Sequence, residues 1–201
     1  MAVVIDKYEI DGNKLVVDLT PELKKLFGIS EKVKVGDLKD GETFGCGKYV
    51  VVEHFDEGKV GVVCNEPTEE TRFGDTYNYN ASEAMKYVVE TCLEDLKSAF
   101  GDGNLFYHSV NLETMDGYDC YGTAVLQPVS VMTFDQYRKY HKFIGNCNKA
   151  EWTSTARSNA DYGFVNSISI RSDGVIQFDN CNNVHVIRPY FELDASVLVD
   201  L

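Results

Sequence analysis

The chain has 201 residues, of which 44% are hydrophobic and 25% charged, a composition typical of an ordered chain with one substantial core. Its 19 basic and 32 acidic residues give a formal net charge of -13, so its field repels nucleic-acid phosphates and anionic membrane surfaces. We therefore expect no nucleic-acid partner and no membrane partner.

The first residues and the cysteines indicate where the chain is made. The N-terminal stretch MAVVIDKYEIDG carries early acidic residues and no long apolar run, so it predicts no secretory signal. The six cysteines are scattered without a CxxC pair, which favours reduced thiols over disulfides or a zinc site. We expect synthesis in the cytoplasm, with association with a virion as a further expectation.

Residues 1–34 are predicted to form a semi-independent N-terminal element. The β-like runs VVIDKYEI and KLVVDL flank Asp11-Gly12-Asn13, whose turn chemistry predicts a hairpin. Thr20-Pro21-Glu22 is typical of a helix start, and we expect a short helix from there to Leu26, ended by Gly28. This element is a candidate for docking or for forming a homo-oligomer.

Residues 35–201 are expected to form the main domain. Between residues 33 and 66, strand-like runs alternate with glycine turns, which predicts a small antiparallel meander. Apolar residues at helical spacing between Ser82 and Gly101 predict a long helix, and a second helix is expected between Thr133 and Gly145. The expected fold class is α+β, with two main helices and short antiparallel sheets.

After Trp152 the sequence changes to short β-like runs. FVNSISI and VIQFD are joined by Ser172-Asp173-Gly174, which predicts a second hairpin. Alternation places Ile168 and Ile170 on one face and Ser167 and Ser169 on the other. The serine face is either a displayed surface or packs against another layer, and the pattern leaves both readings open.

Four stretches together resemble a known family. In chain order they are FGDTYNYNASEAMKYV, FGDGNLFYHSVNLETMDGYDCYG, VSVMTFDQYRKYHKFIG and the final segment from Val186 to Leu193. This ordered set is similar to prophage-associated domains of C-type-lectin-like, or sulfatase-modifying-factor-like, fold, which include variable proteins of diversity-generating retroelements. The resemblance covers roughly residues 35–201.

The resemblance implies a compact mixed fold whose C-terminal strands and loops display ligand-contacting side chains. The strand that begins at Arg188-Pro189 would close the sheet behind them. The chain departs from the family pattern at Glu151–Arg157, where relatives commonly have a tryptophan pair followed by Leu-Arg-Ser-Pro, and it has a single tryptophan. No copper site or catalytic cysteine pair of the modifying enzymes maps onto Cys147 or Cys181.

The candidate ligand-binding residues lie in two polar segments of the C-terminal third. Asn, Asp, Ser and Tyr side chains make the adaptable contacts of antibody-like binding surfaces, but the same residues also make ordinary turns. The candidates are Ser158, Asn159, Asp161, Tyr162, Gln177, Asp179, Asn180, Asn182, Asn183 and His185.

No motif predicts a catalytic, cofactor or metal site. The four histidines are far apart in sequence and none lies in an HExxH pattern, although His185 adjoins the polar loop and could titrate near neutral pH there. Neither of two acidic clusters, at Glu66–Asp75 and Asp116–Asp119, has the spacing of a calcium loop. We expect a non-enzymatic protein that needs no cofactor.

The leading hypothesis is a target-recognition protein of phage or prophage origin that binds a protein or glycan through its C-terminal strands and loops. A structural virion or assembly component is the alternative. An enzyme of the modifying-factor type is the third hypothesis.

Overall fold

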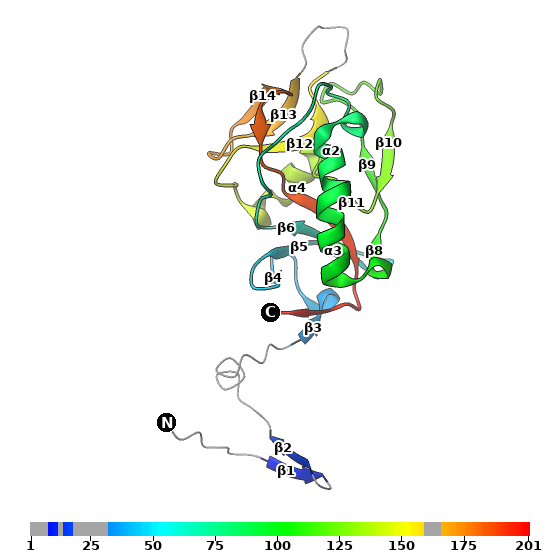
Figure 1. Cartoon of the computed structure of the whole chain (residues 1–201), viewed down its shortest axis with the longest axis vertical. Helices are drawn as coiled ribbons and strands as arrows, with labels where there is room; N and C mark the ends of the chain where they lie inside the picture. Colours follow the sequence, from blue (N-terminus) through cyan, green and yellow to red (C-terminus); the bar gives the residue numbers. More distant parts are fainter. Residues whose placement is uncertain (1–7, 12–13, 18–31, 159–165) are drawn as a thin grey trace.

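Two main helices and several short antiparallel sheets make up the part of the chain that the computed structural model describes, residues 8–11, 14–17, 32–158 and 166–201 (Figure 1). The α+β prediction is confirmed at this level. The short helix expected at residues 20–26 lies outside the described residues.

The predicted N-terminal hairpin is present as a two-stranded antiparallel sheet of β1 (Tyr8–Asp11) and β2 (Lys14–Val17). Its register pairs Tyr8 with Val17 and Ile10 with Leu15. No other described strand pairs with it. Because a lone two-stranded hairpin is at best marginally stable in water, this element needs packing beyond its own two strands.

A larger antiparallel sheet lies at the centre of residues 32–201. It contains the predicted meander and also strands from later in the chain. In order its strands are β11 (Val129–Val131), β16 (Pro189–Asp194), β6 (Lys59–Cys64), β5 (Tyr49–Phe55) and β4 (Thr43–Phe44), with β8 (Leu105–Phe106) also pairing with β16. Strand β16, from near the end of the chain, therefore lies inside the sheet.

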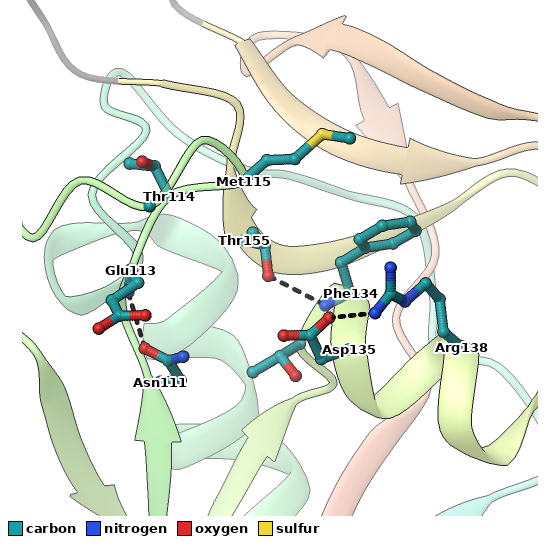
Figure 2. A pocket seen from close by; sticks show the side chains of 10 residues that line it. Asn111, Glu113, Thr114, Met115, Phe134, Asp135, Arg138 and Thr155 are labelled. Carbon is teal, nitrogen blue, oxygen red and sulfur yellow. Dashed lines mark hydrogen bonds and ion pairs between the residues drawn. The ribbon is translucent and has the colours of Figure 1, made fainter.

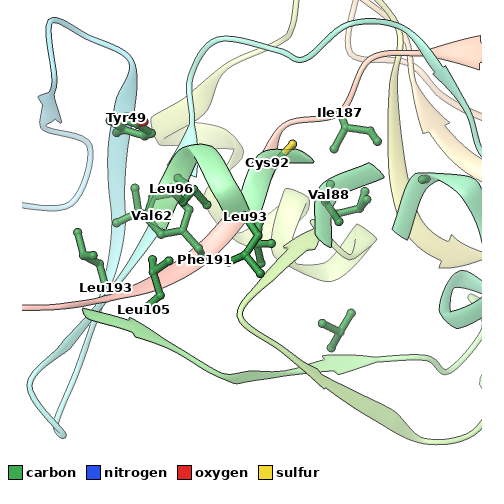
Figure 3. Packing of buried hydrophobic residues seen from close by; sticks show 14 of the residues in the cluster. Tyr49, Val62, Val88, Cys92, Leu93, Leu96, Leu105, Ile187, Phe191 and Leu193 are labelled. Atoms are coloured by element: carbon green, nitrogen blue, oxygen red, sulfur yellow. The ribbon is translucent and has the colours of Figure 1, made fainter. Parts of the chain in front are cut away.

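The central sheet buries a different set of side chains on each face. Tyr49, Val51, Val62, Phe191 and Leu193 belong to one apolar cluster, which includes Val88, Leu93 and Leu96 of the long helix (Figure 3). The intervening residues Val50, Val52, Val63 and Tyr190 belong to a second cluster with the other helix. The two-residue period of the strands thus places one helix on each face.

The long helix is confirmed between its predicted ends but is not uniformly α-helical. It runs as α2 (Glu83–Tyr87), a π-helical segment η3 (Val88–Cys92) and α3 (Leu93–Phe100). The Ser82 side chain accepts a hydrogen bond from the Met85 amide at 3.0 Å, and Gly101 ends the helix with a φ of 86°. The π-helical segment was not predicted.

The second helix, α4 (Phe134–Ile144), has the predicted boundaries. Thr133 and Gln136 form a capping box at its start, and Gly145, with a φ of 57°, follows its last residue. Phe134, Tyr137, Tyr140 and Ile144 form its buried face.

A three-stranded sheet carries the C-terminal hairpin. Its strands are β12 (Glu151–Ala156), β13 (Asn166–Ile170) and β14 (Ile176–Asn180). Ile168 and Ile170 are fully buried, and so are Ser167 and Ser169. The reading of the serine face as a displayed surface is therefore wrong, because Trp152 lies opposite Ser169 and packs on Phe73 with ring centroids 5.5 Å apart.

Three small strand pairs complete the fold. They are β9 (His108–Asn111) with β10 (Ala124–Gln127), β7 (Thr71–Arg72) with β15 (Val184–His185), and β3 (Lys32–Lys34) with β17 (Leu198–Asp200). The last pair brings the two ends of residues 32–201 side by side (Figure 1). None of the helices in the described segments has the length and apolar character to cross a membrane.

Arg188 connects β12, β16 and α4 through buried hydrogen bonds. Its guanidinium donates to both carboxylate oxygens of Glu151, at 2.7 and 2.6 Å, and these two side chains are only 2% and 1% exposed. It also donates to the carbonyls of Ile144 and Gly145, at the C-terminal end of α4. One buried cation with four hydrogen bonds thus joins the starts of β12 and β16 to the end of α4.

Candidate functional site

The loop between β14 and β15 is organised around the carboxylate of Asp179. Oδ2 accepts hydrogen bonds from Gln177 Nε2 at 2.8 Å and His185 Nε2 at 2.6 Å. Oδ1 accepts from the Asn180 amide at 3.0 Å and from the Asn183 side chain. Four donors from one short segment therefore converge on one acceptor group.

The pKa of Asp179 reflects these contacts. Partial burial alone would raise it, but the hydrogen bonds from His185 and Asn183 outweigh burial and lower the pKa below its ordinary value. The His185 ring lies against Trp152, with centroids 4.3 Å apart. His185 thus packs the loop against the buried Trp152, and the Asp179 carboxylate stays ionised at neutral pH.

The structure brings six of the predicted residues together in this loop and separates the rest. Gln177, Asp179 and His185 are half-buried, whereas Asn180, Asn182 and Asn183 are exposed; all six belong to residues 177–185. Ser158 lies apart, where its hydroxyl donates to Asp116 at 2.5 Å. Asn159, Asp161 and Tyr162 lie outside the described residues.

The polar side chains of this loop mainly stabilise the turn itself. Asn180 accepts from the Asn182 amide at 2.9 Å, and the Asn182 side chain accepts from Arg72 of β7. Arg72 in turn pairs with Asp75 at 2.6 Å. Because the loop satisfies many of its own polar groups, it presents a fixed surface rather than an adaptable one.

Sequence reasoning missed the apolar side chains that flank this loop. Ile176 and Phe178 lie directly opposite the buried residues Ile170 and Ile168, yet each is 44% exposed. Val184 is 51% exposed. We call Ile176, Phe178, Asn180, Asn182, Asn183 and Val184 the β14 surface. Their signal in the sequence was the alternating run VIQFD, which does not show that β14 is an edge strand.

Arg157 connects the β14 surface to a neighbouring pocket. Its guanidinium lies 4.5 Å from the centroid of the Phe178 ring, a cation–π contact. One residue earlier, the Ala156 carbonyl accepts from the Met115 amide at 2.9 Å. The half-exposed side chains of Phe178 and Met115 therefore flank the same end of β12.

The pocket beside Met115 has a volume of about 260 Å³. Three segments far apart in sequence form its walls (Figure 2). They are the end of β9 with the loop after it (Asn111, Glu113, Thr114, Met115 and Gly117), the start of α4 (Thr133, Phe134, Asp135 and Arg138) and Thr155 of β12. Sequence reasoning identified none of these as site residues, because the pocket arises only when the three segments meet.

A tight turn fixes the loop wall of the pocket. The Thr114 amide donates to the Tyr118 carbonyl at 2.9 Å, and Gly117 takes a φ of 85° that favours glycine. Burial would raise the pKa of Asp116, but the hydrogen bonds that it accepts from Ser158 and Thr114 outweigh burial and lower the pKa. The turn is therefore anchored to the segment that follows β12.

A second cavity of about 200 Å³ lies between β5, β6 and the long helix, and Cys64 and Cys92 are among its lining residues. Burial raises the pKa of Cys64 to about 12 and that of Cys92 to about 11. Both thiols therefore stay protonated at neutral pH, which is unsuited to nucleophilic chemistry. Neither of the two cavities is lined by Cys147 or Cys181.

One serine–histidine contact resembles part of a catalytic arrangement but is sealed from solvent. His108 Nε2 lies 2.8 Å from Ser130 Oγ, and these residues are 5% and 0% exposed. Burial lowers the pKa of His108 to about 4. No substrate reaches this serine in the observed structure, so we assign the pair a packing role. Within residues 32–158 and 166–201, no cluster of histidine, cysteine and acidic residues has the geometry of a metal site.

Comparisons of the chain with protein-family models, with curated proteins and with solved structures gave no match. The function is therefore inferred from the geometry of the β14 surface and the pocket.

Proposed function

We propose that this chain is a target-recognition protein of phage or prophage origin, with a C-type-lectin-like fold, that binds a protein or glycan through the β14 surface. The family resemblance of the four sequence stretches supports the origin and the fold. Three further features are compatible with it: the paired ends of residues 32–201, one helix on each face of the central sheet, and a separate sheet that bears the polar loop.

The observation that carries the proposal is an apolar sheet face that continues out of the core. Ile168 and Ile170 on β13 are fully buried, but their partners Phe178 and Ile176 on β14 are half exposed. No described strand covers the outer edge of β14. Exposed apolar side chains next to a rigid polar loop are typical of a recognition surface.

The experiment that tests the proposal is a binding screen with matched variants. The labelled chain is applied to an array of bacterial glycans and to bacterial cells, and each positive target is titrated. We expect the double variant Ile176→Ser/Phe178→Ser to weaken binding at least tenfold, because a few side chains buried at the centre of an interface carry most of the binding free energy.

The matched control is Tyr107→Ser/Leu126→Ser, which changes two exposed apolar residues, 66% and 67% exposed, away from this surface. Both double variants are checked for an unchanged melting temperature. Targets that bind the β14 variant as tightly as the wild type, or that lose binding only with the control variant, would contradict the proposal.

The N-terminal hairpin favours a second candidate, a structural component of a virion or its assembly machinery. β1 and β2 pair only with each other among the described strands, so they suit pairing or packing with another subunit. Light scattering of the full chain tests this. A large oligomer that is lost when residues 1–31 are removed supports the assembly role, and a monomer contradicts it.

A further inference from the structure

The pocket at the start of α4 offers a distinctive set of polar groups. Figure 2 shows Asn111 and Glu113 on one wall and Asp135 and Arg138 on the other. Asp135 and Arg138 form an ion pair at 3.1 Å, so their charges largely cancel. The remaining charge is the exposed carboxylate of Glu113, which bonds to no side chain in the part of the chain that the structure describes.

The pocket is poorly suited to an anion, although it lies at a helix start. The Phe134 amide already donates to Thr155 Oγ1 at 2.9 Å, and the Gln136 amide donates to Thr133 Oγ1 at 3.0 Å. Two of the first-turn amide hydrogens that would hold a phosphate or carboxylate are therefore engaged, and the Glu113 and Asp135 carboxylates would repel one.

The unengaged groups instead alternate between donors and acceptors. Asn111 Oδ1 accepts from the Glu113 amide at 2.9 Å, which leaves the Asn111 side-chain NH₂ as a donor. The Glu113 carboxylate is an acceptor, and the Arg138 guanidinium has donors beyond its bond to Asp135. Neighbouring hydroxyl groups match this pattern because each can both donate and accept.

The pocket also has an apolar side and a limited size. The half-exposed Met115 supplies a contact for the C–H face of a ring, whereas the ring of Phe134 is buried and covered by Arg138. At about 260 Å³, the volume lies just below the range of about 300–1,000 Å³ that is common for drug-sized ligands. It therefore suits one small ring rather than a chain of several.

We propose that this pocket binds one uncharged pyranose unit, such as the terminal monosaccharide of a glycan, through Asn111, Glu113 and Arg138. The inference rests on the proposed function, because the pocket then supplies a sugar subsite beside the β14 surface. Glu113 accepts hydrogen bonds from two adjacent hydroxyls, Asn111 and Arg138 donate to hydroxyl oxygens of the sugar, and Met115 covers its apolar face.

Saturation-transfer NMR with the full chain tests this subsite. The probes are the methyl pyranosides of glucose, galactose and mannose, and N-acetylglucosamine, each at millimolar concentration. We expect saturation transfer to at least one of them and at least a tenfold weaker affinity in Glu113→Ala. The control Glu94→Ala, at an exposed residue of α3, leaves the affinity unchanged.

The inference would be overturned by no transfer to any of the four sugars, or by equal affinity in Glu113→Ala and the wild type. Preferential binding of an amine probe such as lysine amide would also overturn it. The Ile176→Ser/Phe178→Ser variant separates the two proposals, because it should keep sugar binding while losing the larger target. If the target still binds through the β14 surface but none of the sugars binds the pocket, only the proposal of a sugar subsite is wrong.

Discussion

At the scale of single residues, the buried pair of Arg188 and Glu151 is the most consequential contact for stability. Removing one partner leaves a buried charge without compensation, which typically costs about 3–5 kcal/mol. We expect Arg188→Met to lower the free energy of unfolding in urea by this amount.

The double variant Arg188→Met/Glu151→Met is the companion test. It removes both charges, so most of the lost stability should return, apart from the two carbonyl contacts at the end of α4. A double variant that is less stable than Arg188→Met would show that the charge pair is not the reason for the loss.

His108 makes the stability depend on pH. Burial lowers the pKa of His108 in the folded state from 6.5 to about 4. Between pH 6.5 and about pH 4, His108 therefore binds a proton in the unfolded state but not in the folded state. The free energy of unfolding should therefore fall as the pH falls through this window, by about 3 kcal/mol from this residue, and His108 should have no effect above it.

Urea unfolding at several pH values between 7 and 4 measures this slope. His108→Gln should give a flatter profile than the wild type, and His54→Gln, at an exposed histidine, serves as the control. Identical slopes for His108→Gln and the wild type would refute the assignment.

At the scale of elements, the β14–β15 loop depends on the Asp179 carboxylate. Asp179→Ala removes the acceptor of four hydrogen bonds, each worth about 0.5–1.5 kcal/mol net. We expect amide exchange in residues 180–185 to accelerate at least tenfold, while exchange in β5 and β6 changes little. Asp173→Ala, which affects the neighbouring turn, should accelerate only residues 171–176.

Elements with strong local signals were predictable from the sequence. The caps at Ser82 and Thr133, and the glycines at 101 and 145, define both helices because capping depends on neighbouring residues alone. The π-helical segment at Val88–Cys92 was not predictable, because its apolar residues also fit α-helical spacing. The burial of Ser167 and Ser169 depends on Trp152 and on the β7–β15 strand pair, and alternation along one strand does not reveal either.

At the scale of the whole molecule, the site depends on contacts that are distant in sequence. β16 enters the sheet between β11 and β6, and the pocket joins residues 111–117, 133–138 and 155. Local patterns could identify the polar loop at residues 179–185, but neither the exposed edge of β14 nor the pocket. The recognition surface is thus a product of the tertiary fold more than of any motif.

Hydrogen exchange of the full chain, with and without a target from the binding screen, tests whether the β14 surface is the recognition surface. We predict slower exchange in residues 175–185 when the target is bound, with little change in β5 and β6. Protection confined to residues 8–17, or to residues 105–127, with residues 175–185 unchanged, would contradict recognition through the β14 surface.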